Sequence, residues 1–278
     1  MTERLQKKVD RAIKLIRSAV GDDVVEVSYS GGKGSDVILE LAKMAGVQFS
    51  AIYKNTTIDP HHTIAHCKEK GVEILRPKFT FFQLITKNGF PTSLARFCCR
   101  FLKEFKVLDK AIHGILRSES SARAKRYSIE DPVICRVYGS KVNHVNVILP
   151  ILDWTDEDVA EFVQERGIKC HPLYYDCGGQ FHPERRLGCM GCPMSVKSAL
   201  QDFNEKPNLV KAWIRAGLKW WDSHPNANSH KKFADIYEVF VHNYFYRSYE
   251  DFDNAVHGGL FGHTDCKEFL EKEFNIKL

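Results

Sequence analysis

The apolar and polar positions of this chain predict an alternation of strands and helices. The first 20 residues carry apolar side chains at helical spacing, so we expect an amphipathic helix there. Residues 24–29 form a short β-branched run that predicts a strand, and the glycine-rich segment 30–36 follows it directly. The next apolar positions, over residues 37–45, recur at helical spacing and end at Gly46. This part of the chain therefore predicts a strand, a glycine loop and a helix.

Similar units continue along the chain. Further strands are expected at residues 47–53, 72–75 and 145–149, and further helices at residues 63–70, 100–113, 209–221 and 231–245. Thr155 and Asp158 form a capping-box pair that predicts another helix start. The alternation predicts an α/β fold: a doubly wound parallel sheet with helices on both faces and a ligand at the carboxyl ends of its strands. We expect an N-terminal helix over residues 1–20, the α/β domain over 21–194 and a helical C-terminal region over 195–278.

Composition and charge narrow the class of protein. With 278 residues, 44% of them hydrophobic and 27% charged, the chain has the composition of an ordinary soluble globule, which excludes a disordered or fibrous protein. No apolar run approaches the roughly 18 residues that a membrane helix needs, so we expect a cytoplasmic protein without a membrane partner. The formal charge of +5 is too small to separate an anionic small ligand from a nucleic-acid surface. The nine cysteines point to metal ligands or redox groups, because a reducing compartment disfavours disulfides.

The first candidate site is an anion site on the loop Ser30-Gly31-Gly32-Lys33-Gly34-Ser35. Glycines let backbone N–H groups turn toward an anion, and the N-terminus of the following helix adds partial positive charge. The two serines would supply hydroxyl donors and Lys33 a cation. The spacing matches neither the Walker pattern nor GxGxxG, and a purely structural turn is the alternative.

The same loop resembles the pyrophosphate loop of the adenine nucleotide alpha-hydrolase group, or PP-loop group. This group includes ATP pyrophosphatases and the phosphoadenosine phosphosulfate (PAPS) reductase family. The usual motif has Asp where this chain has Gly34, and the resemblance implies that this Asp organises a magnesium-bound triphosphate. Its absence argues against ATP cleavage more than against nucleotide binding. We expect Gly34→Asp to raise magnesium-dependent pyrophosphate release, provided that the rest of the site is intact.

Three further segments resemble the same family. Asn55 and Thr56 follow the second predicted strand, where the family places a loop beside the nucleotide. Residues 114–123 resemble its arginine-bearing loop; guanidinium groups suit phosphate or sulfate oxygens, and an exposed charged helix end is the alternative. Residues 149–159 resemble a structural segment, with Trp154 expected in the core. The resemblance assigns the binding of an adenine nucleotide or sulfonucleotide to Ser28, Ser30, Gly31, Gly32, Lys33, Gly34, Ser35, Asn55, Thr56, Arg117 and Arg123.

The cysteines provide a second candidate site. Cys189 and Cys192 form a CxxC turn, and the distant pair Cys98 and Cys99 would complete four thiolate ligands for a [4Fe–4S] cluster or a structural zinc. Zinc sites more often use two CxxC-like pairs, so the adjacent cysteines favour the iron–sulfur cluster. The pattern also resembles the cluster-binding cysteines of assimilatory adenylylsulfate (APS) reductases. Adjacent thiols diverge, so the alternative is that one of Cys98 and Cys99 ligates and Cys135 takes the fourth place.

The sequence does not identify a catalytic nucleophile. Sulfonucleotide reductases carry a cysteine near the C-terminus within a Glu-Cys-Gly-Leu/Ile-His motif, and the resemblance makes Cys266 the candidate in this chain. Its surroundings, residues 263–268, lack the glycine and the histidine of that motif. We therefore expect that Cys266 is not an essential nucleophile.

The resemblance implies sulfur chemistry on an adenine nucleotide beside an iron–sulfur cluster, and three functions stay open. In a sulfonucleotide reductase, a thiolate attacks the sulfonucleotide and AMP or adenosine bisphosphate leaves, with a thiol electron donor as partner. In a PP-loop adenylating sulfurtransferase, ATP with magnesium activates a nucleic-acid acceptor for sulfur from a donor protein. The third function is a non-enzymatic nucleotide-binding module with structural zinc. Basic and aromatic residues near the C-terminus suit nucleic-acid binding, but their spacing favours a helical core.

Overall fold

The computed structural model describes residues 1–139, 141–258 and 264–278, and these form two compact units. The first unit comprises Met1–Asn55, Asp59–Pro77 and Arg100–Gly188. The second unit comprises Thr56–Ile58, Lys78–Cys99 and Cys189–Leu278. Residues 78–99, which the sequence places inside the α/β domain, belong to the second unit.

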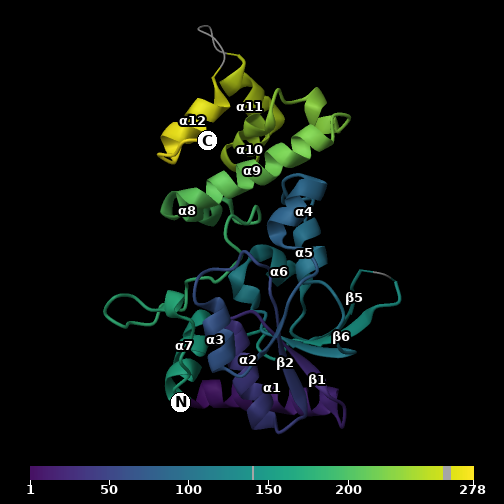
Figure 1. Cartoon of the computed structure of the whole chain (residues 1–278). Helices are drawn as coiled ribbons and strands as arrows, with labels where there is room; N and C mark the ends of the chain where they lie inside the picture. Colours follow the sequence, from purple (N-terminus) through teal and green to yellow (C-terminus); the bar gives the residue numbers. More distant parts are fainter. Residues whose placement is uncertain (140, 259–263) are drawn as a thin grey trace. The chain divides into compact units, whose positions relative to one another are not determined.

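The first unit contains a six-stranded sheet and the helices around it (Figure 1). Its strands are β1 (Val25–Tyr29), β2 (Phe49–Lys54), β3 (Glu73–Leu75), β4 (Lys110–His113), β5 (Val133–Val137) and β6 (His144–Ile148). Its helices are α1 (Glu3–Val20), α2 (Lys33–Ala45), α3 (Thr63–Glu69), α6 (Ser121–Arg126) and α7 (Asp156–Glu165), with the 3-10 helices η1 (Arg117–Glu119) and η2 (Pro172–Tyr174). Helix α5 (Phe97–Leu102) begins in the second unit and ends in the first.

The sheet has the strand order β3-β2-β1-β4-β6-β5. Neighbouring strands pair in parallel, except that β5 runs antiparallel to β6 at the edge. From β1 the chain builds β2 and β3 on one side, and then returns to the other side of β1 with β4. This confirms the doubly wound α/β fold and places a topological switch between β1 and β4. The edge strand β5 is not among the elements expected from the sequence.

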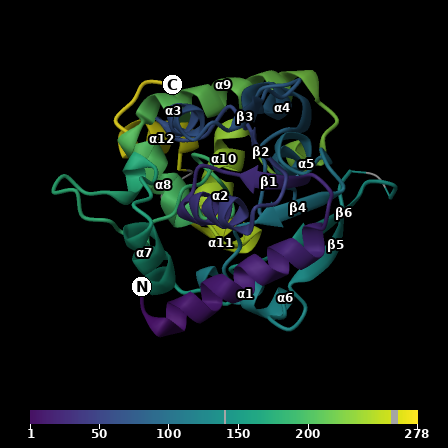
Figure 2. The same cartoon turned by 90° about the horizontal axis from the view of Figure 1, so that it is seen from below.

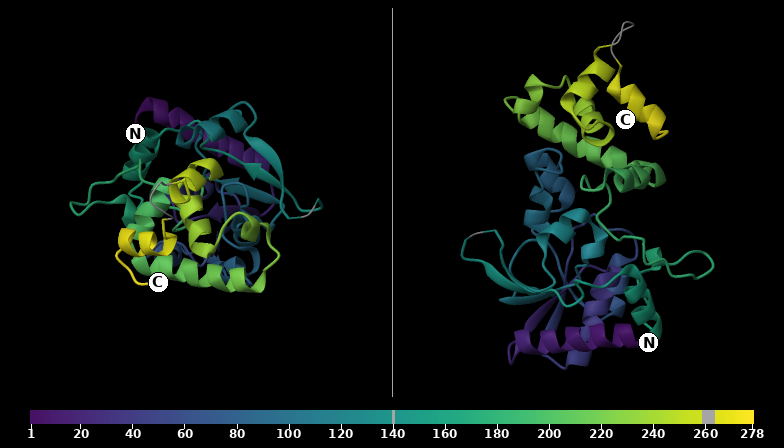
Figure 3. Two further views of the ribbon diagram at one scale, coloured as in Figure 1. Left: turned by 90° about the horizontal axis from the view of Figure 1, so that it is seen from above. Right: turned by 180° about the vertical axis from the view of Figure 1, so that it is seen from behind.

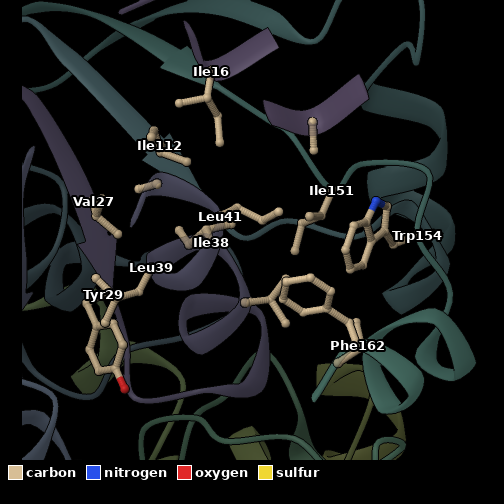
Figure 4. Close-up of a cluster of buried hydrophobic side chains, with 14 of the residues drawn as sticks. Ile16, Val27, Tyr29, Ile38, Leu39, Leu41, Ile112, Ile151, Trp154 and Phe162 are labelled. Carbon is tan, nitrogen blue, oxygen red and sulfur yellow. The ribbon is translucent and has the colours of Figure 1, made fainter. Parts of the chain in front are cut away.

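The core of the first unit lies between the sheet and helices α1, α2 and α7 (Figure 4). Val25, Val27 and Tyr29 alternate along β1 and are buried, as their β-branched and aromatic character predicts. Helix α1 packs its apolar side against α2, which lies beside it in Figure 2. Trp154 is 1% exposed and meets the Phe162 ring edge-on, which confirms its expected place in the core.

The helix expected over residues 100–113 is wrong. Helix α5 ends at Leu102, and residues 110–113 form strand β4 instead. Ala111 and Ile112 pair with β1 and are 1% and 0% exposed. An apolar segment this short fits helical and strand periodicity equally well, so the sheet position offered by β1 decides its conformation.

N-capping side chains determine where two helices begin. The Thr155 hydroxyl accepts from the Asp158 N–H at 3.3 Å, and the Asp158 carboxylate accepts from the Thr155 N–H at 2.9 Å, so the predicted capping box is confirmed. The helix expected from residue 231 begins only at Ile236, because the Asp235 side chain caps it by accepting from the Glu238 N–H at 2.9 Å.

The second unit is helical, as predicted for the C-terminal region (Figure 3). Its helices are α4 (Phe81–Asn88), α8 (Val196–Glu205), α9 (Pro207–Ser223), α10 (Ile236–Phe245), α11 (Tyr249–Val256) and α12 (Cys266–Glu273), with the 3-10 helix η3 (Asn228–Lys231). Phe203, Trp213, Phe240 and Tyr244 are each buried and form an aromatic core. These side chains therefore serve packing, and their faces do not offer stacking platforms for nucleic-acid bases. Within the described ranges, no helix combines the length and the apolar character needed to cross a bilayer.

His257 gives the second unit a stability that depends on pH. Its Nδ1 lies 2.9 Å from Asp253 Oδ1 and its Nε2 lies 3.1 Å from Glu238 Oε1, so both carboxylates raise the pKa of the imidazole above 6.5. A pKa raised in the folded state stabilises the fold fully below 6.5, and this contribution is lost as the pH rises through the folded value. We expect the free energy of unfolding to fall over that window, and His257→Gln to remove this part of the slope. Urea unfolding at a series of pH values measures it.

Asp253→Asn gives a second test, because it removes one of the two carboxylates that raise the pKa of His257, and it should reduce the same part of the slope. An unchanged slope in His257→Gln would contradict the assignment.

Candidate functional site

A cavity of about 340 Å³ opens at the carboxyl ends of β1, β2 and β4. It lies at the topological switch between β1 and β4, which is where open α/β sheets bind their ligands. All of its lining residues belong to the first unit, and most are polar or charged. They are Ser28, Tyr29, Ser30, Ile52, Tyr53, Lys54, Asp59, Lys103, His113, Gly114, Ile115, Arg123 and Tyr138.

The glycine loop leads from Ser30, on the cavity wall, into the first turn of α2. Gly31 has a φ of +79°, a conformation that favours glycine, and Gly32 caps the helix with extended backbone. The Ser35 hydroxyl donates to the Gly32 carbonyl oxygen at 2.6 Å, and the Gly32 N–H donates to Ser30 Oγ at 3.4 Å. These bonds hold the N-terminus of a 13-residue helix, with its partial positive charge, next to the cavity wall.

A close backbone contact explains Gly34. A Cβ atom at residue 34 would lie 2.6 Å from the Gly114 carbonyl oxygen, and a Cβ atom at residue 114 would lie 2.3 Å from the Gly34 carbonyl oxygen. The two glycines therefore let the loop after β4 lie directly on the first turn of α2. An Asp at residue 34 would displace this loop, so the condition attached to the Gly34→Asp expectation, an otherwise intact site, is not met.

Three basic side chains line the cavity. Lys54, the last residue of β2, forms an ion pair with the buried Glu26 at 3.0 Å and donates to the Phe105 carbonyl oxygen at 2.8 Å. Lys103 and Arg123 are the other two. Cations that converge on a partly enclosed space favour an anionic ligand, and a guanidinium group suits the oxygens of phosphate or sulfate.

His113 lines the same cavity as a neutral imidazole. Burial lowers its pKa to about 3, and the charges of Arg136 and Lys54 act in the same direction. A neutral imidazole offers one donor and one acceptor nitrogen, so it suits a hydrogen bond to a nucleobase or a ribose hydroxyl. Near neutral pH the ring holds this form throughout.

Two cations predicted for the nucleotide lie off the cavity wall: the described residues that line it include neither Lys33 nor Arg117. The Lys33 side chain is 3% exposed, and its Nζ lies 3.3 Å from Asp156 Oδ1 and 3.7 Å from Glu119 Oε1. Burial lowers the pKa of Lys33. Arg117 donates from Nη2 to the Ala124 carbonyl oxygen at 2.9 Å.

Asn55 and Thr56 stand on opposite sides of the boundary between the units. The Asn55 N–H donates to the Leu75 carbonyl oxygen at 3.0 Å, next to the pairing of β2 with β3. Thr56 is 1% exposed in the second unit, where its hydroxyl accepts from Cys189 Sγ at 3.6 Å. Thr56 therefore contacts one of the predicted metal ligands.

In the second unit, the backbone of the CxxC turn is held from several sides. The Gly191 N–H donates to Asp202 Oδ2 at 2.9 Å, and the Gly191 carbonyl oxygen accepts from the Tyr244 hydroxyl at 2.8 Å. Gly191 has a φ of +69°, and a Cβ atom there would lie 2.9 Å from the Phe203 ring. Packing and hydrogen bonds thereby fix the turn that carries Cys189 and Cys192.

All four predicted metal ligands belong to the second unit. A hydrogen bond with Cys99 raises the pKa of the Cys98 thiol, and burial and the charges of Cys99 and Cys189 raise it further. Burial, followed by the charges of Cys192 and Cys98, raises the pKa of the Tyr244 hydroxyl. Cys98 is therefore close enough to Cys99 and Cys189 for their charges to act on it, and Cys98 and Cys192 both act on the Tyr244 hydroxyl. Over the part of the chain that the structure describes, no three His, Cys, Asp or Glu side chains lie so that they could hold a metal ion.

The other two cysteine candidates belong to strand β5 and helix α12. Cys135 is on β5 of the first unit, with its Sγ 3.4 Å from His144 Nδ1. Cys266 is the first residue of α12 and is 4% exposed. Burial, helped by nearby carboxylates, raises its pKa to about 12. A buried thiol with a raised pKa is a poor nucleophile, which supports the expectation that Cys266 is not essential.

Lys54, Lys103 and His113 line the cavity but are absent from the site predicted by the sequence. Lys54 and His113 are the last residues of β2 and β4, so the carboxyl end of each strand is the signal that identifies them. Because the sequence predicts a helix over residues 100–113, it does not place His113 at the end of a strand. No periodic pattern marks Lys103, which follows the end of α5.

Comparison with known proteins gives a consistent family. The phosphoadenosine phosphosulfate reductase domain model matches residues 25–195. An uncharacterised 37.8 kDa protein of Escherichia phage 186 is 30% identical over 228 residues, which are 72% of this chain and 64% of that protein. Sulfate adenylyltransferase subunit 2 of Shewanella pealeana is 27% identical over 207 residues, 62% of this chain and 67% of that protein. The structure of PAPS reductase from Candida auris covers 68% of this chain and 96% of its own, with 14% identity and a TM-score of 0.43.

Proposed function

Because this chain belongs to the phosphoadenosine phosphosulfate reductase domain family, we propose that its cavity binds an adenine nucleotide or sulfonucleotide. The phosphate or sulfate end points toward the N-terminus of α2 and Arg123, and His113 contacts the adenosine end. The four cysteines of the second unit hold a [4Fe–4S] cluster, and the protein acts in sulfur chemistry.

One observation carries the nucleotide part of this proposal. The cavity stands at the topological switch and combines basic side chains, a neutral imidazole and the adjoining N-terminus of α2. Cations and helix N-termini stabilise phosphate or sulfate, whereas the imidazole can bind uncharged groups. These two kinds of group match the two ends of a sulfonucleotide.

Gly34 favours a sulfonucleotide over ATP as the reacting ligand. The carboxylate that would hold a magnesium ion on a triphosphate is missing, and the Gly114 carbonyl oxygen occupies the space that its Cβ atom needs. In a reductase, a thiolate attacks the sulfate sulfur, a sulfur–sulfur bond forms, the sulfur–oxygen bond to the phosphate breaks, and AMP or adenosine bisphosphate leaves. Since Cys266 is buried, we propose that a separate thiol donor supplies this thiolate.

The chemistry of the donor set supports the cluster. Four thiols on a fixed turn and a short helix are soft ligands of the kind that iron–sulfur clusters use, and Cys98 already interacts with Cys99 and Cys189. When bound, the cluster would supply a redox-active centre. Zinc on the same four thiols is the alternative.

Arg123→Ala tests the nucleotide site. We expect it to weaken the binding of adenosine 5′-phosphosulfate by about 1.5–3 kcal/mol, since it removes a charge-assisted contact to phosphate or sulfate. Isothermal titration calorimetry measures the affinity. Arg126→Ala is the matched control, because Arg126 lies on the same short helix, is exposed and does not line the cavity. Equal affinities in the wild type and Arg123→Ala would remove Arg123 from the site, and a wild type that binds no adenine nucleotide would overturn the proposal.

A further inference from the structure

The Glu119 side chain lies between two of the cations that the sequence assigns to the nucleotide. Its Oε2 forms an ion pair with Arg123, and its Oε1 lies 3.7 Å from Lys33 Nζ. Glu119 is the last residue of η1 and its side chain is 16% exposed, so the carboxylate is largely screened from solvent. One carboxylate therefore bridges the cationic ends of the glycine loop and of the arginine-bearing segment.

The surroundings of Glu119 are those of an anion site. Arg186 donates to the Glu119 backbone carbonyl oxygen. Burial is the main cause that lowers the pKa of both Lys33 and Arg123, and the charge of Arg186 lowers both further. The charge of Arg123 also lowers the pKa of Lys33. Three cations thus crowd this region, and crowded cations bind an anion strongly. The second acidic group, Asp156, lies 3.3 Å from Lys33 Nζ.

A carboxylate shares its charge and its oxygen donor geometry with one edge of a phosphate or sulfate group. Arginine binds all three through the same N–H fork, so they compete for it. We infer that Glu119 occupies the anion subsite of the free protein as an internal competitor, and that a nucleotide in the cavity binds by displacing it from Arg123, which lines that cavity. This inference rests on the proposed function. It adds that Glu119 lowers the affinity of the protein for its nucleotide.

The structure makes this exchange physically reasonable. Lys33 keeps Asp156 as a partner when Glu119 leaves, so its buried ammonium group is not stripped of counter-charge. Arg123 is 41% exposed and can turn between the carboxylate and a ligand in the cavity that it already lines. Glu119 ends η1 and is followed by Ser120, whose hydroxyl caps α6 by accepting from the Arg123 N–H at 3.2 Å. Rotation of the Glu119 side chain alone would therefore free the cations without unwinding the segment.

Glu119→Gln tests the inference, because the amide keeps the shape of the side chain and removes its charge. We expect this variant to bind adenosine 5′-phosphosulfate roughly tenfold more tightly than the wild type at low ionic strength, as measured by isothermal titration calorimetry. Asp156→Asn should give a smaller gain in affinity, because Asp156 pairs with Lys33, whereas Glu119 pairs with both Lys33 and Arg123. Thermal unfolding of each variant checks that the fold is retained.

Glu130→Gln is the matched control, since Glu130 is exposed in the same unit and its loss changes the net charge equally. Unchanged or weaker binding by Glu119→Gln would overturn the inference, because Glu119 would then support the cations and not compete for them. An equal gain in Glu130→Gln would also overturn it, as a long-range effect of net charge. If neither the wild type nor Glu119→Gln binds any adenine nucleotide, the proposed function fails as well. If the wild type binds the nucleotide and Glu119→Gln binds it no more tightly, the inference about Glu119 fails while the proposed function stands.

Discussion

Gly34→Asp is expected to lower the free energy of unfolding by about 3 kcal/mol and to abolish nucleotide binding. Its Cβ atom would meet the Gly114 carbonyl oxygen at 2.6 Å, and a backbone carbonyl in a packed loop cannot move aside as a flexible side chain can. The loop after β4 would then shift away from the first turn of α2 and carry His113 out of place. Urea unfolding and calorimetric titration with adenosine 5′-phosphosulfate measure the two effects.

Gly188→Ala is the control for this substitution. Gly188 is exposed, and a Cβ atom there would meet nothing within 4 Å, so its stability should stay close to that of the wild type. A stable Gly34→Asp variant that gains magnesium-dependent pyrophosphate release would contradict the steric argument. It would also move the ATP-dependent sulfurtransferase ahead of the sulfonucleotide reductase.

Cys189→Ala is expected to abolish the metal centre that we propose for the second unit. Protein purified without oxygen should be brown and contain iron and sulfide, and the variant should be colourless, because removing one thiolate from a four-thiolate set leaves an iron unligated. Iron analysis and visible absorption spectra measure the loss. Cys192→Ala should behave in the same way, since both thiols stand on the turn that Gly191 and Tyr244 hold in place.

Two further cysteines serve as controls. Cys177 is exposed and lies outside the predicted ligand set, so Cys177→Ala should keep the full iron content. Cys135→Ala should also keep it, and loss of iron in that variant would favour the alternative in which Cys135 is the fourth ligand. If the wild-type protein is colourless and binds one zinc ion, the four cysteines form a structural zinc site and the cluster proposal is wrong.

Local signals in the sequence are sufficient where a contact joins residues that are close in the chain. The Thr155 and Asp158 capping box, the strand over residues 25–29 and the helix that follows the glycine loop all arise from neighbouring residues. The same is true of the CxxC turn. The family resemblance added the order of the segments, and the match over residues 25–195 bears it out.

Long-range contacts account for what the sequence did not predict. Residues 110–113 become a strand only because β1 offers them a parallel partner, and the edge strand β5 needs β6 in the same way. Lys33 and Arg117 have the right residue types for phosphate, yet other groups already hold their side chains. Lys54 and His113 line the cavity only because the carboxyl ends of β2 and β4 lie at the same edge of the folded sheet.

The sequence by itself determined the doubly wound α/β class and the glycine loop between β1 and α2, because these follow from periodicity, residue type and motif spacing; an anion site on that loop and a metal site on four thiols stay predictions. Only the tertiary structure decided which cations face the cavity, that Glu119 bridges Arg123 and Lys33, and that Gly34 is a steric necessity. The physical reason is that such contacts join atoms from segments far apart in the chain. Their distances depend on how helices and strands pack, which no local pattern of residues encodes.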